Sequence, residues 1–217
     1  EQIEQKIFLK PTKEYRHFIK NSYLLLDTLN LCQFKDDSDF EGNDVTPTVE
    51  LIGDNSLTKT LYARQLCGQY HKEKLDAFRD LLESTEDRLI VFYNFNEELN
   101  RLKKICESLG REVSYVNGSG MSMYAYEEIS NSVLFVQYQA GAMGGNYQKA
   151  NKIIYYTLPL GKGSCDLWEQ SKKRIHRIGQ NRPCFYYYLL VKGSFEEQNF
   201  AALQEGKELT DELFKSS

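Results

Sequence analysis

Two arginines in the last quarter of the chain are the strongest candidates for chemistry. Arg174 and Arg177 occur in the segment Gln-Ser-Lys-Lys-Arg-Ile-His-Arg-Ile-Gly-Gln, residues 170–180. A helix would place side chains three residues apart on nearly the same face, and Gly179 would end such a helix. A guanidinium keeps its charge at any working pH and can donate two hydrogen bonds to phosphate oxygens. The segment therefore favours polyphosphate binding, although a solvated basic helix surface would have a similar composition.

The charge of the chain is unevenly distributed. The 217 residues carry a net charge of −4, which argues against a strong free-standing nucleic-acid binder. Residues 149–182, however, hold eight basic and two acidic side chains, a local charge of +6, so the remaining residues carry −10. A basic surface on an acidic body suits a cleft that faces phosphate, although a merely solvated face would look similar.

Composition excludes several classes of protein. No apolar run approaches the length of a membrane span, and the 41% of hydrophobic residues suits a globular fold with no membrane contact. Five cysteines without a Cys-x-x-Cys pair or a histidine cluster indicate neither a metal site nor a disulfide framework. We therefore expect reduced thiols and an intracellular, cytoplasmic location. The start of the chain lacks a methionine and a signal-peptide pattern, which indicates a fragment of a longer protein.

The elements that would position the arginines alternate between strands and helices from residue 87 onward. Short apolar runs predict five strands, and helical patterns separate them. This alternation implies crossover connections, and hence an α/β fold with a mainly parallel sheet covered by helices on both faces. Functional sites on such sheets lie at the carboxyl ends of the strands. The predicted strands are 89–93, 112–116, 132–138, 152–156 and 184–191, and the predicted helices are 96–109, 122–131 and 194–214.

The first 86 residues have a different pattern. Residues 12–32 and 57–83 carry apolar side chains at helical spacing, which predicts helices. Between them, residues 36–54 hold seven acidic and no basic residues. Their spacing lacks the glutamate that ends a calcium-binding loop, so we predict an acidic loop. The expected organisation is a helical lead-in over 1–86, a central lobe over 87–193, and a C-terminal helix over 194–217 that packs on the lobe.

The segment with the two arginines matches a known signature. From Gln170 to Gln180 it resembles, in register, motif VI of the Swi/Snf-type DNA translocases, a branch of the superfamily 2 helicases. The glycine-rich segment 139–146 resembles their motif V, and the segments 91–95 and 115–119 resemble motif IV and the turn that follows it. In motif V the usual lysine is replaced by Gln139, and such departures suggest a compact bacterial or phage branch.

The resemblance implies the second RecA-like lobe of a two-lobe motor, with a P-loop NTPase type of fold. ATP with Mg²⁺ would bind between this lobe and a first lobe, which would supply the Walker residues and hold most of the Mg²⁺ coordination. Residues 160–164 are not a Walker A loop, because Gly163 stands where Ser or Thr is required. We therefore expect the fragment alone not to hydrolyse ATP. The expected partners are the first lobe and DNA, most plausibly duplex DNA.

The resemblance also assigns roles to residues. Arg177 would be the arginine finger with Arg174 beside it, and Gln170 would orient this loop or the attacking water, or else cap the helix. We define the ATP set as the residues expected to bind nucleotide and the DNA set as those expected to contact nucleic acid. The ATP set is Gly144, Asn146, Gln170, Arg174 and Arg177, and the DNA set is Asn94, Ser119, Gln139, Ala140 and Gly141.

Two other functions fit the same residues. One is a lobe of another superfamily 2 branch that acts on DNA or RNA, which the His-Arg-Ile-Gly-Gln ending disfavours. The other is a non-catalytic nucleic-acid or protein-binding scaffold, which the presence of both arginines disfavours. For Trp168 we predict core packing and not base stacking, and for His176 a structural or interlobe role.

Overall fold

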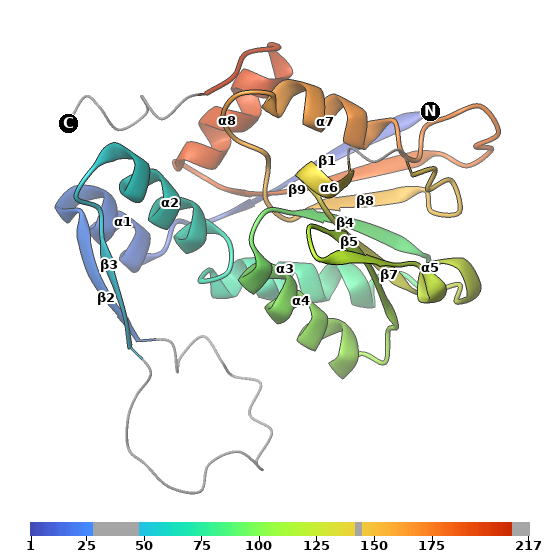
Figure 1. The fold of residues 1–217 in the computed structure, drawn as a ribbon, viewed down its shortest axis with the longest axis horizontal. Coiled ribbons are helices and arrows are strands. Elements are labelled where there is room, and N and C mark those ends of the chain that lie inside the picture. Colours follow the sequence, from blue (N-terminus) through green and yellow to red (C-terminus); the bar gives the residue numbers. More distant parts are fainter. Residues whose placement is uncertain (28–47, 142–144, 210–217) are drawn as a thin grey trace, which may run out of the picture.

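The structure is a computed structural model that describes residues 1–27, 48–141 and 145–209. Its centre is a seven-stranded sheet in the order β1-β9-β8-β4-β7-β5-β6, with helices on both faces (Figure 1). Every pair of neighbouring strands in this sheet is parallel except β5 and β6. The prediction of a mainly parallel α/β sheet is therefore confirmed.

The apolar runs of the sequence form the central strands. β4 (Leu89–Tyr93) is buried along its whole length because helices cover both of its faces. It lies between β7 (Val133–Gln137) and β8 (Lys152–Tyr155). Beyond β7 come β5 (Val113–Asn117) and the short β6 (Gly120–Ser122), and beyond β8 comes β9 (Cys184–Val191). All five predicted strands are confirmed to within one residue at each end.

Two hydrophobic cores flank the sheet. On one face, α3 (Lys72–Glu83) and α4 (Asn96–Ser108) pack on alternate side chains of β4 and β7. On the other face lie α5 (Tyr124–Glu128), α7 (Ser164–Lys172) and α8 (Phe195–Gln204). Trp168 of α7 is buried against Tyr188 and Phe200, so its predicted packing role is confirmed. A single helical turn, α6 (Tyr138–Gly141), follows β7.

The edge strand β1 (Gln2–Leu9) was not expected from the sequence. It pairs with β9 along its full length. Most of its side chains are exposed or half-buried, so the segment contains no apolar run that would identify a strand. The lead-in is therefore not purely helical, and its first strand belongs to the main sheet.

The predicted helix over 12–32 is wrong for residues 22–27, and residues 28–32 lie outside the described residues. α1 (Lys13–Asn21) ends at Ser22, whose φ of 57° is left-handed. β2 (Tyr23–Asp27) follows and pairs antiparallel with β3 (Thr48–Ile52), because Leu24 and Leu26 alternate with exposed neighbours and bury one face of the strand. β3 also replaces the end of the predicted acidic loop, and residues 36–47 of that loop lie outside the described residues. α2 (Ser56–Cys67), with α3, confirms the helical pattern predicted over 57–83.

Two further helices end earlier than predicted. α7 ends at Lys172, so the helix expected to carry both arginines is absent and residues 173–179 form turns and bends. α8 ends at Gln204, where Gly206 takes a φ of 69° and the Lys207 N–H donates to the Ala202 carbonyl at 2.8 Å. This left-handed glycine is a common helix stop. Residues 210–214 of the predicted C-terminal helix lie outside the described residues. No helix in the described part of the chain is long and apolar enough to cross a membrane.

Candidate nucleotide and nucleic-acid surfaces

The two predicted residue sets lie at opposite ends of the parallel strands. Asn94, Ser119 and α6 each follow the end of a strand, so the DNA set lies at the carboxyl edge of the sheet. The segments 145–151 and 173–183 lead into the starts of β8 and β9, so the described part of the ATP set lies toward the amino edge (Figure 1). The sequence-based expectation that all sites lie at the carboxyl edge is therefore wrong for the arginines, because α7 carries the chain back across the sheet.

At the carboxyl edge, Gln137 joins two loops. Its Nε2 donates to the Asn94 carbonyl at 2.9 Å, and its Oε1 accepts from the Gly118 N–H at 3.3 Å. In the second loop the Ser119 N–H donates to Asn117 Oδ1 at 2.9 Å. One side chain at the end of β7 thus sets the positions of the loops that follow β4 and β5.

The Asn94 side chain is used within the lobe. Its Nδ2 donates to Thr157 Oγ1 and to the Leu158 carbonyl, both at 2.9 Å. An amide nitrogen has two hydrogens to donate, so both are occupied. This arrangement ties β4 to the end of β8 and leaves no Asn94 amide donor for a ligand.

A buried carboxylate supports this loop from below. Glu98 Oε2 accepts from the backbone N–H groups of Asn94 and Phe95, at 2.9 and 3.2 Å, and from Thr157 Oγ1 at 2.9 Å. Glu98 is fully buried, and this burial raises its pKa even though the hydrogen bonds favour the charged form. The loop after β4 at the carboxyl edge is therefore held by hydrogen bonds to a buried glutamate.

The remaining members of the DNA set differ in accessibility. Ser119 and Gln139 are exposed, Ala140 is half-buried and packs against the core, and Gly141 ends α6. The structure therefore brings the set to one edge but exposes only some of its side chains.

Toward the amino edge, Arg174 holds the glycine-rich segment. The Arg174 side chain is only 9% exposed, and its Nη1 donates to the Gly145 carbonyl at 3.2 Å. In return the Tyr147 N–H donates to the Arg174 carbonyl at 3.1 Å. These bonds join the two segments that resemble motifs V and VI. They also use the Arg174 carbonyl, which a longer α7 would use for its own helical hydrogen bond.

Two glutamines complete the connection between these segments. Gln180 Nε2 donates to the carbonyls of Gln148 and Ala150, at 3.1 and 3.0 Å. Gln148 Nε2 donates to the Ile178 carbonyl at 2.8 Å, and Asn146 Nδ2 donates to Gln148 Oε1 at 3.0 Å. Most of these acceptors are backbone carbonyls, so the path of the loop does not depend on the side chains at its tip.

Arg177 differs from Arg174 in its surroundings. Its side chain is exposed, and its guanidinium forms no hydrogen bond or ion pair with any described residue. The neighbouring Ile178 is 103% exposed, which is unusual for a large apolar side chain. Gln170 is also exposed, and Gly144 lies outside the described residues. His176 Nδ1 lies 3.0 Å from Gln2 Nε2 of β1, within hydrogen-bonding distance. This is a structural contact within the lobe.

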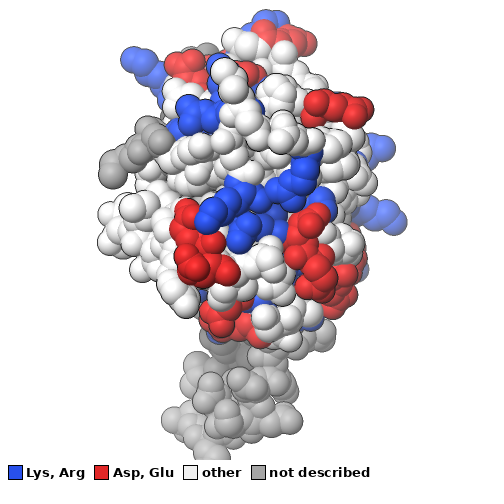
Figure 2. All heavy atoms as spheres, turned by 90° about the vertical axis from the view of Figure 1, so that its right-hand side faces the viewer, with Lys and Arg blue, Asp and Glu red and all other residues white. Residues whose placement is uncertain are grey.

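Basic side chains gather at this amino edge. Figure 2 views the molecule from the side where β9 begins and shows a basic strip with acidic side chains on both sides. Lys152 pairs with Asp87 and lowers the pKa of that carboxyl group, and Lys149 pairs with Glu127. Arg182 Nη2 donates to the Lys149 carbonyl at 2.7 Å. Lys149, Lys152 and Arg182, which lie at or just before the starts of β8 and β9, therefore contribute part of the local positive charge found in the sequence to this edge.

The residues that organise both edges were missed from the sequence. Gln137, Glu98, Thr157 and Gln148 supply the hydrogen bonds described above, and none belongs to the ATP set or the DNA set. Gln137 could have been found, because it is the single amide at the end of a buried apolar run. Within the described residues, no group of three or more His, Cys, Asp or Glu side chains could hold a metal ion.

Comparisons with known proteins place part of this chain in a protein family. Residues 73–179 match the family described as the helicase conserved C-terminal domain. A putative ATP-dependent helicase/translocase of Bacillus subtilis is 24% identical over 66% of this chain and 16% of its own length. A SWI/SNF-related regulator of chromatin, subfamily A-like protein 1, of Xenopus laevis is 28% identical over 60% of this chain and 14% of its own length. The ATP-dependent helicase fft3 of Schizosaccharomyces pombe is 29% identical over 51% and 12%.

A solved structure shares the fold. The C-terminal part of the Fun30 ATPase domain matches with a TM-score of 0.54 and 20% identity, over 69% of this chain and 50% of that chain. The expected RecA-like fold is therefore confirmed. The chain spans about one sixth or less of the length of the relatives above. These relatives come from a bacterium, a frog and a yeast, so the expected bacterial or phage branch stays a prediction.

Proposed function

Because this chain carries the helicase C-terminal domain of the Swi/Snf-type superfamily 2 helicases, we propose that it is the second motor lobe of an ATP-dependent translocase acting on duplex DNA. The observation that carries the proposal is that Asn146, Arg174 and Arg177 lie toward the amino edge of the sheet, whereas Asn94, Ser119 and α6 lie at its carboxyl edge. A motor of this kind needs one surface for the nucleotide and another for the track. We keep the division into 1–86, 87–193 and 194–217 as part of this proposal, with an intracellular location.

The proposed nucleotide surface contains the exposed Arg177. ATP with Mg²⁺, bound against a first lobe that supplies the Walker residues, provides the phosphoanhydride bond whose cleavage drives the motor. Arg177 is the arginine finger: its exposed guanidinium is free of described partners and donates to the γ-phosphoryl oxygens. Its permanent charge stabilises the charge that develops there, an effect worth about 10³-fold or more in rate.

Arg174 is a positioning residue in this proposal. Its buried guanidinium is bonded to the Gly145 carbonyl, so it holds the segment that carries Gly144 and Asn146 against the arginine loop. Gln170, exposed on the last turn of α7, orients this loop or the attacking water. The exposed Ile178, next to Arg177, contacts the first lobe when the two lobes close.

The DNA surface is the carboxyl edge. Ser119, Gln139 and the backbone of α6 contact phosphates of one strand, which sets the register of the lobe without reading sequence. Asn94 acts through its carbonyl and its bonds within the lobe and not as a ligand donor. Opening and closing of the two lobes then moves the DNA edge along the duplex.

The proposal is tested by ATP hydrolysis of the longer parent protein with duplex DNA, single-stranded DNA or RNA. We expect strong stimulation by duplex DNA. Stimulation by RNA or single strands alone would instead assign the lobe to another superfamily 2 branch. Absence of hydrolysis in the parent under all three conditions would favour the scaffold function.

A further inference from the structure

One face of α1 carries a row of basic side chains that the proposed function does not use. Lys13, Arg16, His17 and Lys20 follow the i, i+3, i+4, i+7 spacing that places side chains on one helix face, and all are exposed. We call these four residues the α1 row. The opposite face of α1 buries Tyr15 and Phe18 in a separate hydrophobic core, which α1 forms with α2, β2 and β3. Packing of α1 on α2 therefore fixes the direction in which the row faces.

The cations of the α1 row have no acidic partner within the described residues. Lys13, Arg16 and Lys20 are absent from every ion pair formed there, whereas lysines on other elements, such as Lys72 and Lys149, are paired. Glu14 is the one acidic residue of the helix. A row of cations without an ion pair to any described residue, on a packed helix, suits an extended anionic partner.

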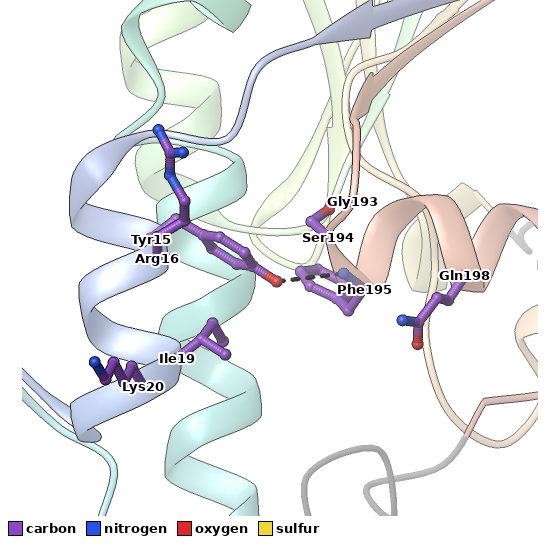
Figure 3. A pocket seen from close by; sticks show the side chains of 8 residues that line it. All are labelled: Tyr15, Arg16, Ile19, Lys20, Gly193, Ser194, Phe195 and Gln198. Atoms are coloured by element: carbon purple, nitrogen blue, oxygen red, sulfur yellow. Dashed lines mark hydrogen bonds between the residues drawn. The ribbon is translucent and has the colours of Figure 1, made fainter.

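A cavity lies beside this row. It has a volume of about 310 Å³ and opens between α1 and the start of α8 (Figure 3). Arg16 and Lys20 line it from α1, and Ser194, Phe195 and Gln198 line it from the other side. The first amide of α8, on Phe195, donates to Tyr15 Oη at 3.3 Å, which fastens the two elements together. The cavity is thus lined by parts of two cationic side chains from α1 and by Gln198 from α8, and the charged ends of Arg16 and Lys20 point away from Gln198 (Figure 3).

The α1 row lies at the same edge of the sheet as the DNA set. α1 follows the end of β1 and α8 follows the end of β9, and these strand ends are joined by the Lys192 N–H donating to the Leu9 carbonyl at 2.8 Å. In the strand order, β4 is two places from β9 and β5 is four places away. With strands about 4.8 Å apart, these offsets are about 10 and 19 Å along the edge. The larger offset corresponds to about six base pairs at 3.4 Å per pair.

We propose that the α1 row and the adjoining cavity form a second phosphate-binding surface for the same DNA duplex. The inference rests on the proposed function and extends it to residues outside the matched helicase domain. One duplex laid along the carboxyl edge reaches the loops after β4 and β5 and also α1. The lobe then contacts the duplex at two separated surfaces, the loops after β4 and β5 and the α1 row. Contact through the α1 row does not depend on those loops.

The test is duplex DNA binding by the longer parent protein, measured by fluorescence anisotropy from about 50 to about 200 mM KCl. The variant is Arg16→Gln with Lys20→Gln. The matched control is Lys103→Gln with Lys104→Gln on α4, which removes the same charge from two lysines without an ion pair in the described structure. Circular dichroism and thermal unfolding establish that both variants fold, since neither change touches a buried side chain.

We expect the Arg16/Lys20 variant to lose about tenfold in affinity, the value of one charge-assisted hydrogen bond or more. Its salt slope should fall by about 1–2, because each lost phosphate contact removes about 0.9. Equal effects in the control pair, or none in either, would overturn the inference while leaving the proposed function intact. The same proteins are also titrated with polyglutamate. If the Arg16/Lys20 variant loses polyglutamate binding while its duplex binding is unchanged, the α1 row binds an acidic polypeptide and the inference is overturned. Failure of the unmodified parent protein to bind duplex DNA would instead contradict the proposed function itself.

Discussion

The carboxyl and amino edges of the sheet are built in different ways. At the carboxyl edge, a few side chains hold the loops, with Gln137 above and the buried Glu98 below. At the amino edge, Arg174, Gln148 and Gln180 bind mostly backbone carbonyls. The exposed Arg177 extends from this framework. Each neutral bond of that framework contributes about 1 kcal/mol, whereas removing one member of a buried charged network costs several times more.

The two edges therefore differ in which residues support the fold and which are exposed to a ligand. The carboxyl edge depends on buried charge, so its weak points lie in the interior of the lobe. The amino edge distributes its support over many hydrogen bonds and leaves the Arg177 side chain exposed at the surface. Substitutions at the two edges should therefore affect stability and catalysis in opposite proportions.

The largest expected effect on stability is at the buried ion pair beneath the end of β9. Lys74 Nζ lies 2.7 Å from Glu196 Oε1, with side chains 0% and 3% exposed, and Glu196 Oε2 accepts from the Val191 N–H. Lys74→Met leaves a buried carboxylate without its partner and should cost about 3–5 kcal/mol in the free energy of unfolding, measured in urea. The control Lys72→Met breaks a half-exposed pair with Asp76 and should cost less than about 1 kcal/mol. Similar losses in both would show that burial of the pair is not decisive.

The pH dependence of stability should report the same buried acids. Burial raises the pKa of Glu98 and of Glu196 in the folded chain. Between the unfolded value of about 4.3 and the raised folded pKa, the folded state binds more protons, so stability falls as pH rises through this window. Each pKa unit of the difference is worth about 1.4 kcal/mol. Glu98→Gln should flatten this fall, and Glu97→Gln, at the half-exposed neighbouring position, should retain it. A steeper fall in Glu98→Gln would contradict the sign of the effect.

A smaller effect is expected at Gln137. Gln137→Ala removes the bonds to Asn94 and Gly118 and should lower the free energy of unfolding by about 1–2 kcal/mol, since the exposed Gly118 amide regains water. In the parent protein it should raise the DNA concentration for half-maximal ATPase stimulation and leave the KM for ATP unchanged. Gln204→Ala, at an exposed position on α8, is the matched control. A change in the KM for ATP alone would place Gln137 with the other edge.

The smallest effect is expected at the rim of the amino edge. Lys149 and Glu127 are both about half-exposed, at 48% and 43%. Lys149→Ala should therefore change the free energy of unfolding by less than about 1 kcal/mol, and by nothing measurable in high salt. Thermal unfolding at two salt concentrations measures this. A larger, salt-independent loss would mean that this rim is a structural support comparable to Lys74.

How far the sequence predicts this fold depends on how much of each element is buried. The strand Leu89–Tyr93 is buried throughout, and its apolar run alone predicts its bounds. Gln2–Leu9 is an edge strand with mostly polar, exposed side chains, and only its pairing with β9 identifies it. Tyr23–Asp27 has leucines that suit a helix or a strand, and pairing with Thr48–Ile52 decides between them.

The candidate site follows the same logic. The signature from Gln170 to Gln180 identifies the arginines, because their types and spacing are local properties of the sequence. The exposure of each arginine depends on distant parts of the chain. Arg174 is buried and bonds to Gly145, twenty-nine positions away, whereas Arg177 is exposed. The placement of the arginines toward the amino edge and the organising role of Gln137 likewise depend on the crossover connections, which no single segment encodes.

The most direct test of the account is ATP hydrolysis by the parent protein, with saturating duplex DNA, for Arg177→Ala and Arg174→Ala. Nucleotide affinity and thermal unfolding are measured on the same proteins. We expect Arg177→Ala to lose about 10³-fold in kcat with nucleotide binding largely retained and stability unchanged. Arg174→Ala should lose stability as well, because the Gly145 carbonyl loses its partner. Full activity in Arg177→Ala, or a loss of stability equal to that of Arg174→Ala, would contradict the assignment of the exposed arginine to catalysis.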